Sequence, residues 1–113
     1  TNSQEPEWFT TAPAEAMRRA AKKAGWEMES IDLFEVNEAF AVVALAAERE
    51  LKIPHEKMNV WGGAISLGHP IGASGARILV TLIHALKDRG KKRGMAGICI
   101  GGGEATAVCV ELA

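Results

Sequence analysis

Apolar positions follow a helical period in some stretches of this chain and a strand-like period in others. Thr11 is expected to cap a first helix and Gly25 to end it. Between them, Met17 and several alanines fall on one helical face and four basic residues on the other. This spacing predicts an amphipathic surface helix with Pro13 in its opening turn.

Six further segments continue the alternation. Short apolar runs predict strands, and longer runs that end near Pro54 or Gly90 predict helices. The expected elements are a strand at 33–37, a helix at 38–51, a strand-like piece at 59–65, a helix at 70–89, and strands at 95–100 and 105–112. The order α-β-α-β-α-β-β predicts an α/β fold, with a mixed, mostly parallel sheet, helices on both faces and a C-terminal antiparallel hairpin.

Two of these expected helices are more apolar than a small domain needs. The helix at 38–51 contains AFAVVALAA, and the helix at 70–89 contains ARILVTLIHAL. Helices that are apolar all round are expected to be buried on every side. A chain of 113 residues hardly supplies both covering layers, so we expect a partner layer from another domain or another subunit.

The composition of the chain argues against several classes of function. The first residues, TNSQEPEW, are polar and have no periodic pattern, so residues 1–12 are expected to be a linker or a cut end, and residues 13–113 one domain. A net charge of −1 favours neither nucleic acid nor a membrane surface, and no apolar run is long enough to span a bilayer. The two cysteines form no CxxC pair, so no metal site is expected. Reduced thiols fit the cytoplasm or a reducing organelle such as a mitochondrion or peroxisome.

The stretch GHPIGASGAR, residues 68–77, places His69 in a glycine-rich turn before a helix. A phosphate-binding P-loop would need Lys and then Ser or Thr where His69 and Pro70 stand, and the glycine spacing does not fit a dinucleotide-binding loop. A helix N-terminus offers free N–H groups and a partial positive charge beside the imidazole. A packing turn with an incidental histidine remains the alternative.

Two more segments carry candidate chemistry at strand ends. In CIGGGEA, Cys99 ends an apolar strand, and the glycines that follow can aim N–H groups at an oxyanion; the alternative is a small buried residue before a flexible turn. In NEAF, Asn37 can offer its amide to a ligand or a water, or can simply cap a helix. Because ligands gather at the carboxyl ends of parallel strands, Asn37, His69 and Cys99 together indicate an acyl-transfer site.

The segments NEAFA, GGAISLGHPIGASGAR and CIGGG, in this order and spacing, resemble the C-terminal half of the thiolase family, and the resemblance covers residues 13–112. It implies acyl transfer between coenzyme A thioesters, either thiolytic cleavage of 3-ketoacyl-CoA or condensation of two acyl-CoA molecules. Cys99 would be the acid/base, and His69 would activate the nucleophilic cysteine and donate to the thioester oxygen. Asn37 would hold a water in that oxyanion hole.

The resemblance also implies a second oxyanion site at the N–H of Gly101, and a pantetheine or acyl pocket lined by Phe40 and Ile100. The family's nucleophilic cysteine belongs to an N-terminal half that this sequence does not contain, and Cys109 does not match it. The first strand of the C-terminal half is also expected to be absent. The chain is therefore expected to be a fragment, a processed piece or one chain of a split enzyme.

Such a chain is expected to be inactive alone and to work with the N-terminal half in a homodimer or tetramer. Its substrates would be coenzyme A and acyl-CoA, with no permanently bound cofactor and no metal. The alternative is a non-catalytic thiolase-like piece kept for dimerisation or as a scaffold.

Overall fold

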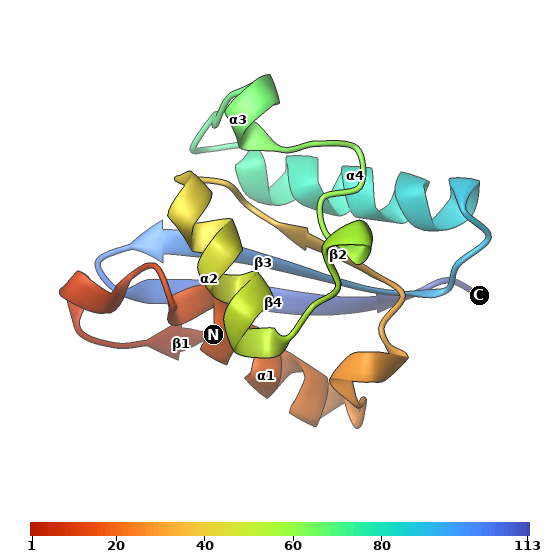
Figure 1. Ribbon diagram of the computed structural model, residues 1–113, viewed down its shortest axis with the longest axis horizontal. Helices are drawn as coiled ribbons and strands as arrows, with labels where there is room; N and C mark the ends of the chain where they lie inside the picture. The colour runs from red at the N-terminus through yellow and green to blue at the C-terminus, as the bar shows by residue number, and fades with distance from the viewer.

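A four-stranded sheet lies between helices in the computed structural model, which describes all residues from 1 to 113 (Figure 1). The strands are β1 (Asn2–Ser3), β2 (Leu33–Val36), β3 (Arg93–Gly101) and β4 (Glu104–Glu111). The α-helices are α1 (Ala12–Ala24), α2 (Ala41–Leu51), α3 (Ala64–Leu67) and α4 (Ser74–Asp88). Three 3-10 turns, η1 (Pro6–Trp8), η2 (Met28–Ser30) and η3 (His55–Lys57), complete the chain.

The sheet has the strand order β1-β4-β3-β2. β3 and β4 form the expected antiparallel hairpin, β1 pairs antiparallel with β4, and only β2 and β3 run parallel. The sheet is mixed, as predicted, but its parallel share is smaller than expected. The reason lies in segment 59–65, which forms only isolated bridges before α3 and adds no strand.

Each face of the sheet has its own hydrophobic core. On one face, Met17 of α1 packs with Phe34 and Met95, together with buried residues of α2. On the other face, Leu82 and Leu86 of α4 pack against a second cluster of sheet residues. Figure 1 shows α1 and α4 on opposite sides of the sheet, so helices cover both faces as the apolar pattern predicted.

Two predicted helices begin later than expected. α2 begins at Ala41 rather than at residue 38, and α4 begins at Ser74 rather than at residue 70. In the second case the carbonyl of Pro70 accepts N–H groups from Ala73 and Ser74 in a turn, and the regular helix follows it. Gly25 ends α1 in the left-handed conformation as expected, but Thr11 makes no side-chain cap and donates instead to the carbonyl of Trp8.

The first twelve residues, expected to be a linker or a cut end with no strand, contain β1 and η1. Asn2 is buried and pairs with Ala105, and the backbone N–H of Gln4 donates to the carbonyl of Gly103. This corrects the expectation that no strand precedes the first helix. The sequence does not predict this strand because its side chains are polar. The strand joins the sheet through backbone hydrogen bonds rather than through an apolar face.

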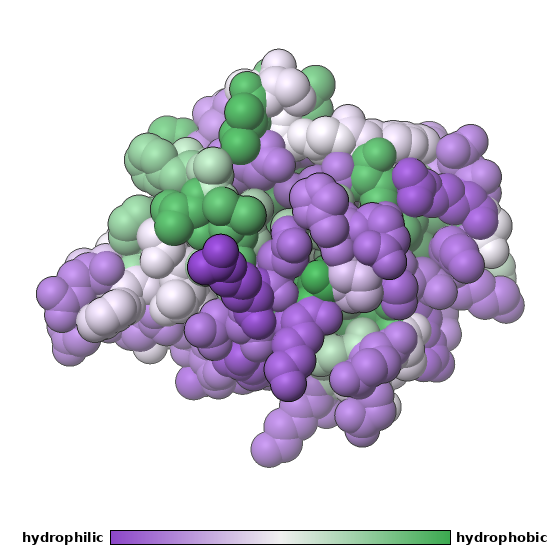
Figure 2. Space-filling view, in the orientation of Figure 1, coloured by the Kyte–Doolittle hydropathy of each residue, from purple (hydrophilic) through white to green (hydrophobic).

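The apolar helices are not buried on every side within this chain. Val42 and Leu45 on α2 are half exposed, and so is Val80 on α4. Apolar residues gather toward the upper left of Figure 2, over the region of α2 and α3 in Figure 1. None of the helices is both long and apolar enough to cross a membrane.

Candidate active site

Asn37 continues the parallel ladder one residue beyond β2. Its backbone N–H donates to the carbonyl of Gly97 at 2.9 Å, and its side chain is completely buried. It does not cap α2, because Phe40 occupies the N-cap position and makes no side-chain cap there. The side-chain Oδ1 atom of Asn37 is buried and has no hydrogen-bond partner. A buried acceptor without a partner is costly, so this atom is available to a ligand or a water.

The segment that leads to His69 is tied to this end of β2 by two polar side chains. Asn59, at φ 47°, bonds both the N–H and the carbonyl of Val36, at 2.8 and 2.9 Å. Glu38 accepts from the amide of Asn59 at 3.2 Å and from the backbone N–H of Ile65 at 3.0 Å. Sequence reasoning missed both residues, although Glu38 lies inside NEAF.

His69 contacts a polar partner on each side of its ring. Its Nε2 atom lies 3.5 Å from the amide nitrogen of Asn37, and its Nδ1 atom lies 2.5 Å from the hydroxyl of Ser74. The structure therefore brings Asn37 and His69 together, as predicted. The imidazole lies ahead of the turn at 70–73 rather than at the first turn of α4. Sequence reasoning also missed Ser74. Its hydroxyl reaches His69 only because the turn at 70–73 brings the two residues together in the folded structure.

Cys99 and Gly101 lie where β3 ends in an irregular register with β4. Cys99 is a free, buried cysteine, and its burial raises the pKa of the thiol, with a smaller opposing effect from its own backbone N–H. The three glycines from Gly101 to Gly103 all have positive φ values, of 85°, 59° and 82°. Glycine adopts positive φ values without strain and other residues do not, so the turn depends on its three glycines.

One apolar hollow of about 430 Å³ joins these elements. It is lined by Phe9, Ala39, Phe40, His69, Ile71, Ile98, Cys99, Ile100 and Gly101. Five of the six residues predicted for the site line this hollow, and the sixth, Asn37, lies against His69. Phe40 and Ile100 are each more than half exposed, so they form its outer wall. The cluster holds an imidazole, a thiol and a glycine turn beside a largely apolar surface.

A buried ion pair lies near the site. Glu35 of β2 is 1% exposed, and its Oε2 atom is 3.5 Å from the guanidinium of Arg77 on α4. Burial raises the pKa of Glu35 to about 7, against the opposing effect of Arg77 and with a smaller contribution from Glu38. No group of three His, Cys, Asp or Glu side chains in the chain is placed to hold a metal ion.

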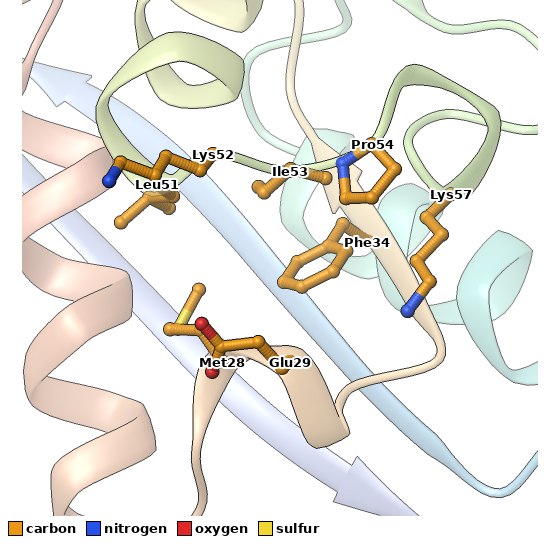
Figure 3. Close-up of a pocket in the computed structure, with 8 residues that line it drawn as sticks. All are labelled: Met28, Glu29, Phe34, Leu51, Lys52, Ile53, Pro54 and Lys57. Carbon is orange, nitrogen blue, oxygen red and sulfur yellow. The ribbon is translucent and has the colours of Figure 1, made fainter.

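A second pocket, of about 130 Å³, is smaller and lies away from these residues. Figure 3 shows its lining, with Phe34, Leu51 and Ile53 toward its interior and the amines of two lysines at the periphery. It contains no histidine or cysteine, so it carries none of the chemistry predicted from the sequence.

Comparison with known proteins identifies the family. Residues 1–112 match the family model described as "Thiolase, C-terminal domain". The chain belongs to the thiolase family. This thiolase C-terminal domain is 58% identical over 110 residues to acetyl-CoA acetyltransferase 2 of Arabidopsis thaliana, covering 97% of this chain and 27% of that protein.

Solved thiolase structures have the same fold. The Acat5 thiolase of Ascaris suum, solved in complex with coenzyme A, superposes with a TM-score of 0.92 at 49% identity, covering 99% of this chain and 29% of that one. Human mitochondrial 3-ketoacyl-CoA thiolase superposes with a TM-score of 0.96 at 46% identity, covering 99% of this chain and 28% of that one. The chain therefore spans little more than a quarter of the length of the relatives it matches.

Proposed function

We propose that this thiolase domain supplies the acid/base group and the oxyanion-binding groups of an enzyme that transfers acyl groups between coenzyme A thioesters. The observation that carries the proposal is the convergence of His69, Cys99 and the Gly101 turn on one apolar hollow, with Asn37 directly behind the histidine. The relatives support the substrate class, because one is named an acetyl-CoA acetyltransferase and another is solved with coenzyme A.

Cys99 would act first as the general acid and then as the general base of the reaction. In the thiolytic direction, a nucleophilic cysteine adds to the keto carbon of a 3-ketoacyl-CoA, and the bond between the α-carbon and that carbon breaks. The departing enolate takes a proton from Cys99, whose thiol is protonated at rest because burial raises its pKa. The thiolate left on Cys99 then takes the proton of the incoming coenzyme A thiol. The coenzyme A thiolate attacks the acyl-enzyme carbonyl, the bond to the nucleophilic cysteine breaks, and acyl-CoA leaves; His69 returns its proton to the freed cysteine thiolate.

His69 and Asn37 would stabilise the oxygen of the enolate. His69 takes the proton of the nucleophilic cysteine and then donates from Nε2 to the thioester oxygen. The unpartnered Oδ1 atom of Asn37 is a ready acceptor for a water that supplies a second donor to the same oxygen. The N–H of Gly101 would serve the oxyanion formed on the acyl-enzyme. Each such donor is worth about 3 kcal/mol of transition-state stabilisation in comparable enzymes.

Phe40 and Ile100 would contact the acyl or pantetheine portion of the substrate. Both are large, apolar and exposed at the wall of the hollow. Apolar walls with a few convergent polar groups are typical of small-molecule sites. No permanently bound cofactor is needed for this chemistry, since coenzyme A is itself the substrate.

The nucleophile would come from an N-terminal thiolase half, because Cys109 is the only other cysteine here and lies opposite Met95 in the β3–β4 hairpin. The half-exposed apolar face of α2 is where such a half, or a second subunit of a dimer or tetramer, would pack. The assembly would work in a reducing compartment, the cytoplasm or a reducing organelle, and the two free thiols support this proposal.

The test is to join this chain to the N-terminal half of the Arabidopsis relative and to measure coenzyme A-dependent cleavage of acetoacetyl-CoA. We expect no turnover from the 113-residue chain alone and measurable turnover from the assembly. Cys99→Ala should abolish turnover while acylation of the nucleophile still proceeds in part, because the proton transfers are lost and the nucleophile is not. Cys109→Ala is the matched control and should leave turnover unchanged.

Full turnover by the chain alone would contradict these roles. A stable assembly with no turnover would instead support a dimerisation or scaffold function, which the exposed apolar face also allows.

A further inference from the structure

We propose that Ser74 holds His69 in the neutral tautomer that carries its proton on Nδ1, so that Nε2 is kept free as the proton acceptor of the site. Ser74 would thus be a positioning residue, acting through the imidazole and not on substrate. The inference rests on the proposed function for its catalytic consequence, and on hydrogen-bond geometry alone for the tautomer.

The argument begins on the Asn37 side of the ring. The amide nitrogen of Asn37 can only donate hydrogen bonds, and it faces Nε2 at 3.5 Å. In a neutral imidazole one nitrogen donates and the other accepts, so Nε2 must be the acceptor here. A proton on Nε2 would set two N–H groups against each other. The contact is also long for a hydrogen bond, which leaves the Nε2 lone pair available to another group.

The contacts of Ser74 on the other side of the ring fit this assignment. Ser74 is 1% exposed, and its hydroxyl lies 2.5 Å from Nδ1 of His69 and 3.1 Å from the carbonyl of Pro70. With Nε2 as the acceptor, the neutral ring carries its proton on Nδ1, so the Ser74 hydroxyl accepts that proton and donates its own hydrogen to the carbonyl of Pro70, which also accepts the backbone N–H groups of Ala73 and Ser74. In this series the Asn37 amide faces Nε2, the Nδ1–H donates to Ser74, and the Ser74 hydroxyl donates to the carbonyl of Pro70.

The arrangement also suits both protonation states of the ring. When His69 takes a proton on Nε2 it becomes imidazolium, and the Nδ1–H still donates to Ser74 without any rearrangement. A partner that fixes the second ring nitrogen is a common way to set the tautomer and the orientation of a working histidine. Because Ser74 opens α4 and is packed in place, the ring would be held by a helix rather than by a loop.

The tautomer can be measured directly by NMR in the protein that carries this sequence, labelled with ¹⁵N-histidine. At about pH 9, where histidine rings are neutral, long-range ¹H–¹⁵N correlations separate protonated from unprotonated ring nitrogens. We expect His69 to show a protonated Nδ1 and an unprotonated Nε2. Substitution of His55 and His84 assigns the three sets of signals. A wild-type ring protonated mainly on Nε2 would overturn the proposal, even if no variant folds.

Variants separate a tautomer role from a purely structural one. Ser74→Ala removes the acceptor of the Nδ1 proton. Because the Asn37 contact of 3.5 Å is too long to hold the ring by itself, the Nε2–H share of the His69 population should rise, while Ser74→Thr keeps a hydroxyl and should retain the wild-type pattern. Ser66→Ala is the matched control, since its hydroxyl makes a similar bond to the carbonyl of Gly63, at 3.0 Å, and contacts no histidine. An unchanged tautomer in Ser74→Ala would also overturn the proposal.

Kinetics in the assembled enzyme provide the second readout. Ser74→Ala should lower kcat by about tenfold to a hundredfold and leave KM within about twofold, because Ser74 is buried and away from substrate. Ser74→Thr should restore most of kcat. If no assembly shows thiolase activity, the proposed function fails while the NMR result still decides the tautomer, so the two failures are distinguishable.

Discussion

Glu35 is an acidic residue buried in β2, two residues before Asn37 of the proposed catalytic cluster. Its side chain is 1% exposed, one carboxylate oxygen has no hydrogen-bond partner, and the other is 3.5 Å from Arg77. Desolvation therefore outweighs the attraction of Arg77 and raises the pKa of Glu35 to about 7. Glu38 is the other charged group that acts on it, and it acts in the same direction as burial.

This shift makes stability depend on pH in a defined direction. The folded chain holds the Glu35 proton more tightly than the unfolded chain does, so the stabilisation is complete below the ordinary glutamate pKa of 4.5 and is lost as the pH rises to about 7. The size is about 3 kcal/mol. Glu35→Gln should remove that fall from denaturant-unfolding curves measured between these pH values. The exposed Glu56→Gln should preserve it, and an unchanged pH dependence in Glu35→Gln would refute the assignment.

At the scale of elements, Glu38 couples the connector after β2 to the loop that carries His69. Its carboxylate bonds the N–H of Ile65 in α3 and lies against Gly63 so closely that a Cβ on Gly63 would come within 2.6 Å of it. The extended backbone of Gly63 would accept another residue, so the constraint is space rather than conformation. The position of this loop therefore depends both on the carboxylate of Glu38 and on glycine, with no side chain, at position 63.

Gly63→Ala should destabilise the fold by about 1–3 kcal/mol, because the new methyl group displaces the Glu38 carboxylate. Glu38→Ala removes the obstacle, so the double variant should lose less stability than the two single losses combined, in a double-mutant cycle read by chemical denaturation. Gly75→Ala is the matched control, because nothing lies within 4 Å of its added Cβ and it is in α4. Strict additivity of Gly63→Ala and Glu38→Ala would show that the two residues are not coupled.

At the scale of the whole molecule, the chain covers both faces of its sheet but leaves the outer face of α2 half exposed. Phe40, Val42 and Leu45 contribute to this surface, and Ile65 and Ile71 extend the exposed apolar area beyond α2. Single exposed apolar residues are ordinary, but a gathered group next to the proposed catalytic cluster is typical of an interface. On the proposed function, the N-terminal half or a second subunit packs there.

Leu45→Lys should weaken association with the N-terminal half by about tenfold or more, because it places a charge in the proposed contact. Lys23→Glu, a charge change at the exposed C-terminal end of α1, should leave association unchanged. Titration calorimetry or analytical ultracentrifugation measures the difference. Equal affinity for Leu45→Lys and the wild type would place the interface elsewhere.

The sequence by itself determined the class of fold, the β3–β4 hairpin and the residues that meet at the site. Apolar periodicity reports which face of an element is buried, and chemistry-bearing residues at strand ends are brought together by the sheet. Patterns of this kind are local, so they can be recognised in the sequence without knowledge of the tertiary fold. They were sufficient to single out His69 and Cys99, which line one hollow, whereas Phe40 in the same hollow was indicated only by the resemblance to the thiolase family.

Only the tertiary structure decided the features that depend on contacts between distant segments. β1 is polar and two residues long, and it exists because the edge of β4 is there to pair with it. Asn59 and Ser74 gained their partners when a loop and a turn folded back against β2 and His69. A hydrogen bond to a remote backbone or ring atom leaves no periodic trace along a chain, which is why pattern alone could not reveal these residues.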